Sequence, residues 1–416
     1  MTSDKFPNDF LWGASTSSYQ VEGGNHGQWS TWEEAHAKAL AKNAPQKYGW
    51  FADWEAIKAQ ATDPANYICG KGVDHYNRYA EDFALIKKLG LNTFRFGIEW
   101  SRVEPREGEW DQAAIKHYHE YIARLRKMGI EPMLTLWHWT MPEWFTNKRG
   151  FEKRRNLKYF ERYVAKMSEE LGAEVTYVLT LNEPNVYAAL SYGQGIWPPQ
   201  DKNPLHTLAV YYNLMLVHKR AYRIWKQRNP QAQISIAAHL VNSQPASKAP
   251  TAKLLVKLVD YAWNWWYLDR IKRHVDFIGL NYYFTDYYTA LGTKRNPKGP
   301  YNDMGWYMEP RGIEPLLLKT WRRYKIPIII TENGLADAAD TRRQWWIEET
   351  LASLRSLLRQ GVDLRGYLHW SLLDNFEWSD GWRPRFGLVA VDRTTMQRTI
   401  RPSAGWFAEQ IKQLTK

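Results

Sequence analysis

The feature that most constrains the fold of this chain is an alternation of short apolar runs with amphipathic stretches along its whole length. Runs rich in β-branched and aromatic residues predict eight strands, at residues 10–16, 93–100, 131–139, 177–184, 233–240, 276–283, 327–334 and 364–374. Apolar residues at helical spacing predict helices after them, at residues 74–89, 111–128, 157–171, 205–228, 251–272, 313–324, 341–360 and 402–412. Since each parallel crossover needs a connection that is usually a helix, this order predicts an α/β fold, a closed (β/α)8 TIM barrel.

A doubly wound sheet is the competing arrangement for alternating strands and helices. Such a sheet usually has a glycine-rich phosphate turn after its first strand, and the sequence Trp12-Gly13-Ala14-Ser15-Thr16 is not one. The chain has no linker, low-complexity tract or further repeat. We therefore expect one barrel domain over residues 1–416.

Composition and charge limit the classes of partner. Hydrophobic residues make up 44% and charged residues 24% of the chain, which is ordinary globular usage. The net charge of +12 raises the question of nucleic acid, but basic and acidic residues alternate along most predicted helices, and the dense basic run at 148–155 contains Glu152. A solvated surface is the favoured interpretation, so we expect no nucleic-acid partner.

The sequence offers no sign of export or of membrane insertion. Cys69 is the only cysteine, so an intrachain disulfide is impossible. The first ten residues lack the basic and apolar segments of a signal peptide, and no run of about 18 apolar residues occurs. These observations predict a cytoplasmic protein without a membrane partner.

Two glutamates at strand ends are the candidate catalytic residues. In a parallel barrel the carboxyl ends of all strands open on one face, and a polar residue there is costly unless it has a function or a partner. Glu183 ends the predicted strand at 177–184, and Glu332 ends the strand at 327–334. Two carboxylates about 5 Å apart can carry out a double displacement on a glycoside, in which one attacks the anomeric carbon and the other protonates the leaving oxygen.

The surroundings decide which carboxyl keeps a proton. Mutual repulsion leaves one proton on such a pair at neutral pH. Arg95 in the second strand and Tyr283 at the end of the sixth can both stabilise an ionised Glu332, which leaves Glu183 as the acid. Each glutamate alone would also fit a buried ion pair or a loop cap, so the prediction rests on the two together.

Longer motifs give the chain a resemblance to a known family. Asn182-Glu183-Pro184 together with Thr331-Glu332-Asn333-Gly334 resembles the signature pair of glycoside hydrolase family 1, the β-glucosidase and β-galactosidase family. The resemblance extends over nearly the whole chain through further motifs, which are Phe10-Leu11-Trp12-Gly13, Tyr19-Gln20-Val21-Glu22-Gly23, Phe94-Arg95-Phe96, Trp100-Ser101-Arg102, Leu136-Trp137-His138-Trp139, 276–283 and 370–378.

The resemblance implies an exo-acting retaining β-glycosidase that hydrolyses β-glucosides, β-galactosides or β-fucosides and needs no cofactor. It makes Glu332 the nucleophile and Glu183 the acid/base, with Arg95 and Tyr283 positioning Glu332. It assigns Asn182 to the sugar 2-hydroxyl and Asn281 to the catalytic surround. The residues that it assigns to the nonreducing sugar are Gln20, His138, Trp370, Glu377 and Trp378. The roles of Trp139, Trp382 and Phe386 stay open between sugar contact and packing.

Two regions depart from the family pattern. The connection between residues 240 and 276 is shorter than in most members, where this loop walls the leaving-group side, so we expect that side of the pocket to be wide. Residues 28–72 cannot be placed from sequence. Their tryptophans, Trp29, Trp32, Trp50 and Trp54, would fit either a roof over the site or ordinary packing.

Several other functions compete with this prediction. A phosphoglycosidase is disfavoured because Glu377 would repel an anion, and a thioglucosidase is disfavoured because Glu183 is present. A sugar-binding relative without catalysis is disfavoured because both carboxylates are intact. His117 and His119 lie two apart on a predicted helix and face different ways, so no metal site is expected. The oligomeric state is not predicted.

Overall fold

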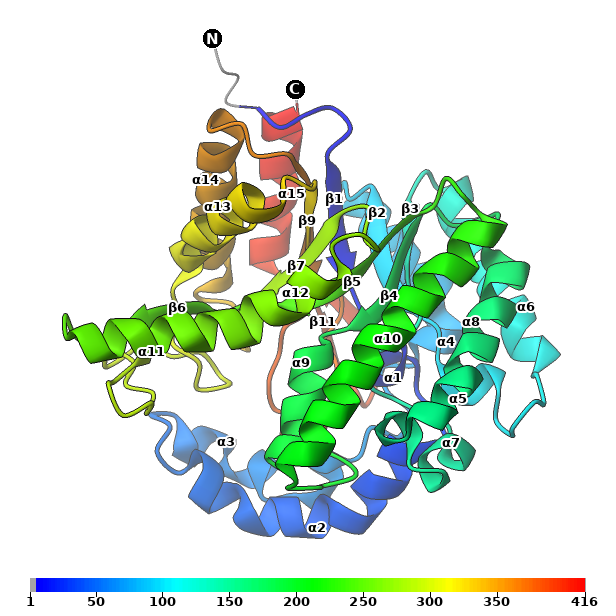
Figure 1. Ribbon diagram of the computed structural model, residues 1–416, viewed down its shortest axis with the longest axis horizontal. Helices are drawn as coiled ribbons and strands as arrows, with labels where there is room; N and C mark the ends of the chain where they lie inside the picture. Colours follow the sequence, from blue (N-terminus) through cyan, green and yellow to red (C-terminus); the bar gives the residue numbers. More distant parts are fainter. Residues whose placement is uncertain (1–4, 416) are drawn as a thin grey trace.

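The computed structural model describes residues 5–415 and has a closed barrel of eight parallel strands at its centre (Figure 1). Around the barrel the strands follow chain order, and the last closes against the first. Their bounds are β1 Leu11–Ser15, β2 Thr93–Gly97, β3 Glu131–Thr135, β4 Tyr177–Asn182, β5 Gln233–His239, β7 Ile278–Tyr282, β9 Ile328–Asn333 and β10 Leu364–Trp370. The predicted (β/α)8 barrel is confirmed. The predicted domain of residues 1–416 includes 1–4 and 416, which lie outside the described residues.

Each barrel strand lies within its predicted range and ends one to four residues before the carboxyl end of that range. Eight helical segments follow the strands, and most agree with prediction within two residues at each end. They are α4 His75–Lys88, α6 Gln112–Lys127, α8 Leu157–Leu171, α10 Pro204–Arg228, α11 Pro250–Asp260 with α12 Trp266–Ile271, α13 Ile313–Tyr324, α14 Arg343–Arg359 and α15 Pro402–Thr415. The single helix predicted at 251–272 is therefore wrong in detail, since the π-helix η5 Tyr261–Trp265 separates α11 from α12.

The core has two layers, as a packed barrel requires. Inside the barrel a small apolar cluster fills the interior, made of Met133, Leu179, Ala237, Phe277, Ile329 and Leu368. A much larger apolar cluster lies between the strands and the surrounding helices. Because the interior is filled, the carboxyl-end face is left as the place for a cavity.

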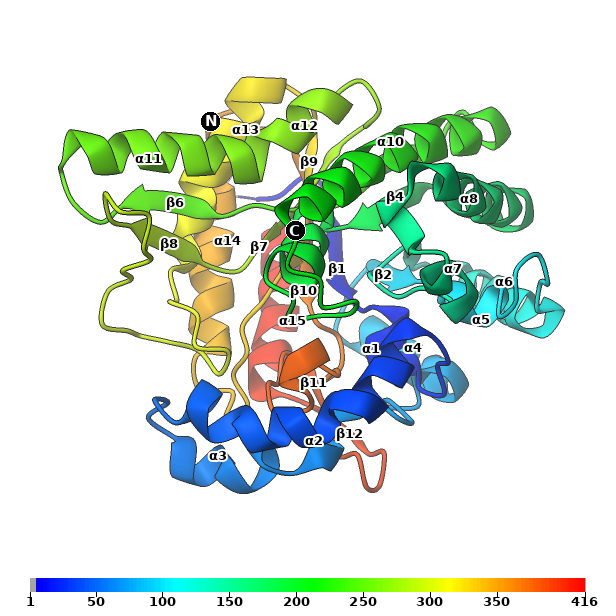
Figure 2. The same cartoon turned by 60° about the horizontal axis from the view of Figure 1, so that its bottom comes forward.

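Elements that the strand and helix pattern did not predict lie around this face. Helices α2 Gln28–Tyr48 and α3 Trp54–Ala61 lie along one side of it, at the bottom of Figure 2. The short strands β6 Asn242–Pro245 and β8 Thr285–Tyr288 pair with each other and, with α11, project to one side (Figure 2). A hairpin of β11 Val389–Val391 and β12 Arg398–Ile400 follows the last barrel strand. Within 5–415 we find no helix of the length and apolarity that a membrane crossing requires.

Candidate active site

The two candidate glutamates line one cavity of about 490 Å³ at the carboxyl ends of the strands. Glu183 directly follows β4 and Glu332 is the second-last residue of β9, and each is only 3% exposed. Two carboxyl groups are therefore buried in the same cavity, where burial and neighbouring charges shift their pKa values.

Glu332 is held by two donors. The Arg95 guanidinium, itself fully buried in β2, forms an ion pair with Glu332 Oε1, and the Tyr283 hydroxyl donates to Oε2 at 2.5 Å. Arg95 is fixed in turn, since it donates to Thr135 Oγ1 at 3.0 Å and to Asn182 Oδ1 at 2.7 Å. Both oxygens of the Glu332 carboxyl thus have a donor partner, and these two contacts stabilise its ionised form.

Glu183 has weaker partners. Asn281 Nδ2 donates to Glu183 Oε1 at 2.7 Å, and the same amide accepts from Thr331 Oγ1 at 2.6 Å through its oxygen. Among the described residues no arginine or lysine forms an ion pair with Glu183. One oxygen of this carboxyl is left for another partner.

The two pKa values differ for these reasons. Burial first, and then the charge of Glu332, raise the pKa of Glu183 well above its ordinary value. Burial also raises the pKa of Glu332, but Arg95 and the Tyr283 hydroxyl oppose that rise. Glu183 is therefore the carboxyl that keeps the proton, and Glu332 is the one that stays charged.

The backbone at both strand ends is specialised. Glu183 has φ 40° in the left-handed region, which is uncommon for a residue with a side chain, and Trp139 and Trp378 beside the cavity also have positive φ. Gly334 follows β9 where a Cβ would lie 1.8 Å from the Trp370 carbonyl oxygen, so no other residue fits. The close approach of two strands thus accounts for the glycine of the Thr-Glu-Asn-Gly motif.

The remaining predicted polar residues form a hydrogen-bonded layer beside the glutamates. Asn182 Nδ2 lies 3.0 Å from His138 Nε2. Gln20 Nε2 donates to the Phe376 carbonyl at 2.7 Å and lies 3.4 Å from Glu377 Oε2, which also accepts from Asn375 Nδ2 at 2.8 Å. The structure therefore brings all eleven predicted site residues to the same end of the barrel.

Two atoms of this layer have no protein partner among the described residues, although both are buried. They are Gln20 Oε1 and His138 Nδ1. Burial, with the charge of Arg95, lowers the pKa of His138 well below its ordinary value, so the ring is neutral and one nitrogen can donate while the other accepts. A buried unpaired polar atom is costly, and sugar hydroxyls would satisfy both of these atoms.

Aromatic side chains enclose the same region. Trp370 and Trp378 line the cavity, and His138 packs between them with ring centroids at 5.8 Å and 6.0 Å. Of the three aromatic residues left open by the sequence, Trp139 and Phe386 line the cavity. Trp382 does not, since its indole donates to the Ile68 carbonyl and its ring packs under Arg393.

We call this buried part of the cavity the inner end, lined by His138, Glu183, Glu332, Trp370, Glu377 and Trp378. The outer end is lined by side chains of the connections, which include Val186, Leu190, Val241, Val259 and Trp263. Leu190 lies in the π-helix η4 Ala188–Gly193 and Trp263 in η5, and π-helices are frequent at functional sites. The shortened connection therefore supplies part of the wall of the outer end.

Some residues of the site were not predicted. His239 ends β5 and lines the cavity, so the strand-end criterion would have found it. Burial, with the charge of Lys294, lowers the pKa of His239 to about 3, so it is neutral. Thr135 and Asn375 hold Arg95 and Glu377 in place, and nothing in their local sequence signals these contacts.

The unplaced region 28–72 supports the inner end from behind. Trp29 of α2 packs on Trp378 with ring centroids 4.7 Å apart. Glu33 accepts from the Tyr19 hydroxyl at 2.9 Å, and the Tyr19 ring stacks on Trp378 at 5.8 Å. By contrast, Trp50 is 60% exposed. The tryptophans of this region therefore differ in role. Trp29 packs on a residue that lines the cavity, whereas Trp50 lies at the surface.

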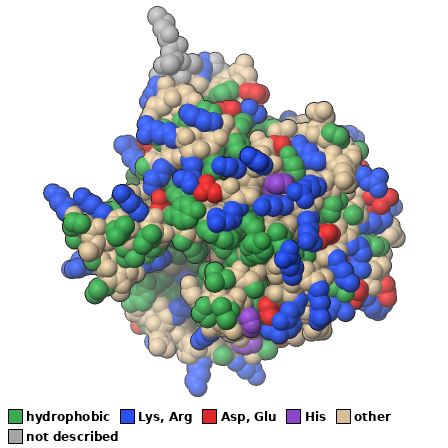
Figure 3. All heavy atoms as spheres, in the orientation of Figure 1, with side chains coloured by type: hydrophobic (Ala, Val, Ile, Leu, Met, Phe, Trp, Pro, Cys, Tyr) green, Lys and Arg blue, Asp and Glu red, His purple; other side chains and the backbone are tan. Residues whose placement is uncertain are grey.

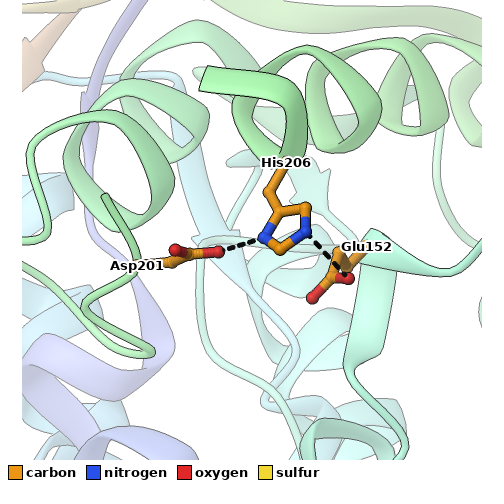
Figure 4. A group of neighbouring side chains, drawn as sticks. All are labelled: Glu152, Asp201 and His206. Carbon is orange, nitrogen blue, oxygen red and sulfur yellow. Dashed lines mark hydrogen bonds and ion pairs between the residues drawn. The ribbon is translucent and has the colours of Figure 1, made fainter. Parts of the chain in front are cut away.

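One group of described residues has the composition of a metal site. Ligand atoms of Glu152, Asp201 and His206 lie within 4.8 Å of one another, and Figure 4 shows the imidazole between the two carboxylates. Glu152 Oε1 is already paired with Arg149 at 2.6 Å and Lys153 at 3.0 Å, and these charges oppose a cation. None of the three lines the cavity. The group fits a surface ion-pair network better than a metal centre.

Comparison with known proteins agrees with this geometry. The profile described as glycosyl hydrolase family 1 matches residues 2–273 and 266–415, so the match divides within α12, near the shortened connection. Beta-glucosidase A of Acetivibrio thermocellus is 30% identical over 462 aligned positions, with 99% of each chain covered. The beta-galactosidase of Sulfolobus acidocaldarius is 28% identical, with 97% of this chain and 94% of that protein covered.

Solved structures give the same result. A beta-glycosidase from Pyrococcus horikoshii superposes with a TM-score of 0.86 at 33% identity, covering 98% of this chain and 95% of that one. A family 1 β-glucosidase from Thermotoga maritima superposes with a TM-score of 0.87 at 28% identity, with 99% of each chain covered. The likeness therefore extends over the barrel and its connections together.

Proposed function

From the premise that this chain belongs to glycosyl hydrolase family 1, and is therefore a retaining β-glycosidase, we propose that Glu332 is its nucleophile and Glu183 its acid/base. The observation that carries the assignment is the unequal environment of the two carboxyls. Arg95 and Tyr283 bind both oxygens of Glu332, whereas Glu183 is bound by the neutral amide of Asn281. A nucleophile must be ionised and an acid must hold a proton.

The proposed reaction has two displacements. In the first, Glu332 attacks the anomeric carbon, the glycosidic C–O bond breaks, and Glu183 gives its proton to the leaving oxygen. In the second, Glu183 accepts a proton from water, which attacks the anomeric carbon and releases Glu332. Since the first step consumes the negative charge of Glu332, the pKa of Glu183 falls when the glycosyl-enzyme forms, which suits its change from acid to base.

The polar layer of the inner end would bind the nonreducing sugar. Asn182 sits between Arg95 and His138, where its amide can reach the 2-hydroxyl of a sugar attached to Glu332. Gln20 and His138 each offer a buried unpaired atom, and Glu377 can accept from hydroxyls. Trp370 would form the platform for the apolar face of the ring. Substrates are then β-glucosides, β-galactosides or β-fucosides, cleaved from the nonreducing end.

Azide rescue tests the two roles. Glu332→Gly should abolish hydrolysis of an aryl glycoside, and azide should restore turnover with an α-glycosyl azide as product, because the small anion enters in place of the missing carboxylate. Glu183→Ala should give a β-glycosyl azide from a substrate with an activated leaving group, because azide then attacks the glycosyl-enzyme. The opposite pair of products would show that the two roles are reversed.

A 6-phosphorylated substrate is the main rival. The side chain of Glu377 is bound by the amides of Gln20 and Asn375, which leave its carboxyl facing the sugar site without a basic partner. A phosphate group there would gain no basic partner from that carboxyl, and its charge would raise further the pKa of Glu377, which burial already raises to about 8. Equal kcat/KM on a β-glucoside and its 6-phosphate would contradict the proposed substrate class.

A further inference from the structure

Helix α11, outside the sugar site, carries an exposed apolar stripe. Leu254 is 61% exposed, Leu258 is 60% exposed, and Tyr261, the next residue after the helix, is 42% exposed. These residues are four and three apart, so they lie on one face. Ala252, Val256 and Asp260 are the buried positions and lie on the opposite face, so the exposed stripe does not serve to pack α11 on the protein.

The loop that follows β8 lies beside this helix and exposes another leucine. A carbon placed as Cβ on Gly292 would lie 3.7 Å from the Leu255 side chain of α11, which fixes the loop next to the helix. Its neighbour Leu291 is 92% exposed, the largest value among the exposed large apolar residues of the described chain. We call residues 246–261 and 287–302 together the projecting arm.

The exposed charges of the projecting arm have one sign, since its only acidic residue, Asp260, is buried. Residues 246–259 and 287–302 contain no aspartate or glutamate, whereas they contain six exposed basic residues, Lys248, Lys253, Lys257, Lys294, Arg295 and Lys298. Of these six, only Lys294 forms an ion pair within the described part of the chain, with the buried Asp286. Figure 3 shows apolar and basic side chains side by side over α11 at the left of the molecule.

The arm adjoins the mouth of the active-site cavity. Val259 of α11 and Lys294 of the loop both line the outer end. Whatever binds the arm is therefore close to the path by which a glycoside enters.

We propose that the projecting arm docks on an anionic lipid bilayer, with the leucines in the apolar layer and the basic residues among the headgroups. Protruding leucines on a helix face and at a loop tip suit a deformable apolar phase, and interleaved lysines suit its negative surface. A second copy of the chain does not fit, because contact between two such arms would bring together positive charges only. The absence of a membrane-spanning helix does not bear on docking of this kind.

Vesicle flotation with the full-length protein tests the proposal. At low salt the protein should float with phosphatidylcholine vesicles that contain about 30% phosphatidylserine, and not with phosphatidylcholine alone, because each basic residue near an anionic surface adds to binding. Leu254→Ser with Leu258→Ser and Leu291→Ser should reduce the bound fraction at least about tenfold, since these side chains supply the apolar part of binding. The same variant should keep its melting temperature and its activity on a dissolved aryl glycoside.

A matched control comes from α10, where Leu205 is 73% exposed and Leu208 is 64% exposed next to the acidic Asp201. Leu205→Ser with Leu208→Ser should float as well as the unaltered protein. The proposal is overturned if no anionic vesicle is bound, if the α10 variant loses binding equally, or if the arm variant floats normally. It is also overturned if the arm variant instead changes a dimer to a monomer in light scattering.

Discussion

The inner and outer ends of the cavity are built on different principles. At the inner end, polar side chains from strand ends are buried and fixed by one another, as in the contacts of Arg95 with Glu332, Asn182 and Thr135. At the outer end, apolar side chains from connections line the space, and Val186, Leu190 and Val259 are partly exposed there.

This difference indicates which end of the cavity can distinguish one substrate from another. A fixed polar group that a wrong substrate leaves unpaired costs a full desolvation penalty, whereas an apolar wall loses only a little contact area. The inner end should therefore distinguish sugars sharply, and the outer end should accept many leaving groups.

Replacement of Arg95 by methionine should have the largest effect. Loss of one partner of a buried ion pair costs about 3–5 kcal/mol, so kcat/KM should fall by a factor of about 10² to 10⁴. Arg95 lowers the pKa of Glu332, and its removal raises that pKa. Glu332 would then ionise only at higher pH, and the acidic limb of the kcat/KM profile should move upward in pH.

Arg102→Met is the control for this variant, because Arg102 also pairs with a buried glutamate, Glu22, but does not line the cavity. It should lower stability without moving the acidic limb. A profile that moves equally in both variants would show that Arg95 acts on stability alone.

Replacement of Gln20 by leucine should have the next largest effect. The change removes the donor to Glu377 and the unpaired oxygen that we assign to a sugar hydroxyl. A buried polar group left without its partner costs about 1–3 kcal/mol, so kcat/KM should fall about 5- to 150-fold. The factor should be the same for every leaving group on the same sugar. A factor that depends on the leaving group would show that Gln20 also affects binding at the outer end, so that the two ends do not act independently.

The position of the inner end could be predicted because its information is local. Glu183 and Glu332 each come at the end of an apolar strand, and a barrel brings all strand ends to one face whatever the connections do. Glu183 and Glu332 are close in space only because β4 and β9 belong to the same barrel, and the strand pattern alone predicts that barrel.

The outer end could not be predicted in the same way. Strands β6 and β8 pair only with each other, and the residues Asn242–Pro245 have little strand propensity of their own, so pairing with a distant partner decides their structure. The π-helix that turns Trp263 into the cavity also depends on packing, since Asn264 holds the Val241 backbone there by two hydrogen bonds. Helix α2 was missed because its contacts with Tyr19 and Trp378 are tertiary.

Glu33 offers a test of the support that α2 gives to the inner end. Burial raises the pKa of Glu33 to about 8, whereas an unfolded glutamate ionises near about 4.3. Between these values the folded protein binds one more proton than the unfolded chain, so the stability contributed by Glu33 falls as pH rises. The fall is up to about 1.4 kcal/mol per pH unit, and Glu33→Gln should remove it.

Urea unfolding at pH 5, 6, 7 and 8 measures this slope. Glu55→Gln is the control, because the Glu55 side chain is 82% exposed. If Glu33→Gln and the control have equal slopes, Glu33 is not protonated in the folded protein. Reduced kcat/KM for Glu33→Gln with an unchanged slope would point to a different link between α2 and Trp378.

The smallest effect is expected at the outer end, from Val259→Ala. Two methyl groups are lost from an apolar wall, and at about 0.8 kcal/mol per buried carbon the change in kcat/KM should be at most about 15-fold, for long alkyl leaving groups only. Nitrophenyl glycosides should be unaffected, because a short leaving group need not reach α11.

The unaltered protein should show the same tolerance, with kcat/KM for leaving groups of matched pKa differing less than about a hundredfold, or about 2.7 kcal/mol. A larger spread would mean that the outer end is closed to some leaving groups. The segment to examine would then be α2, because Lys47 of that helix lines the cavity and pairs with Asp380, another lining residue, at 2.8 Å.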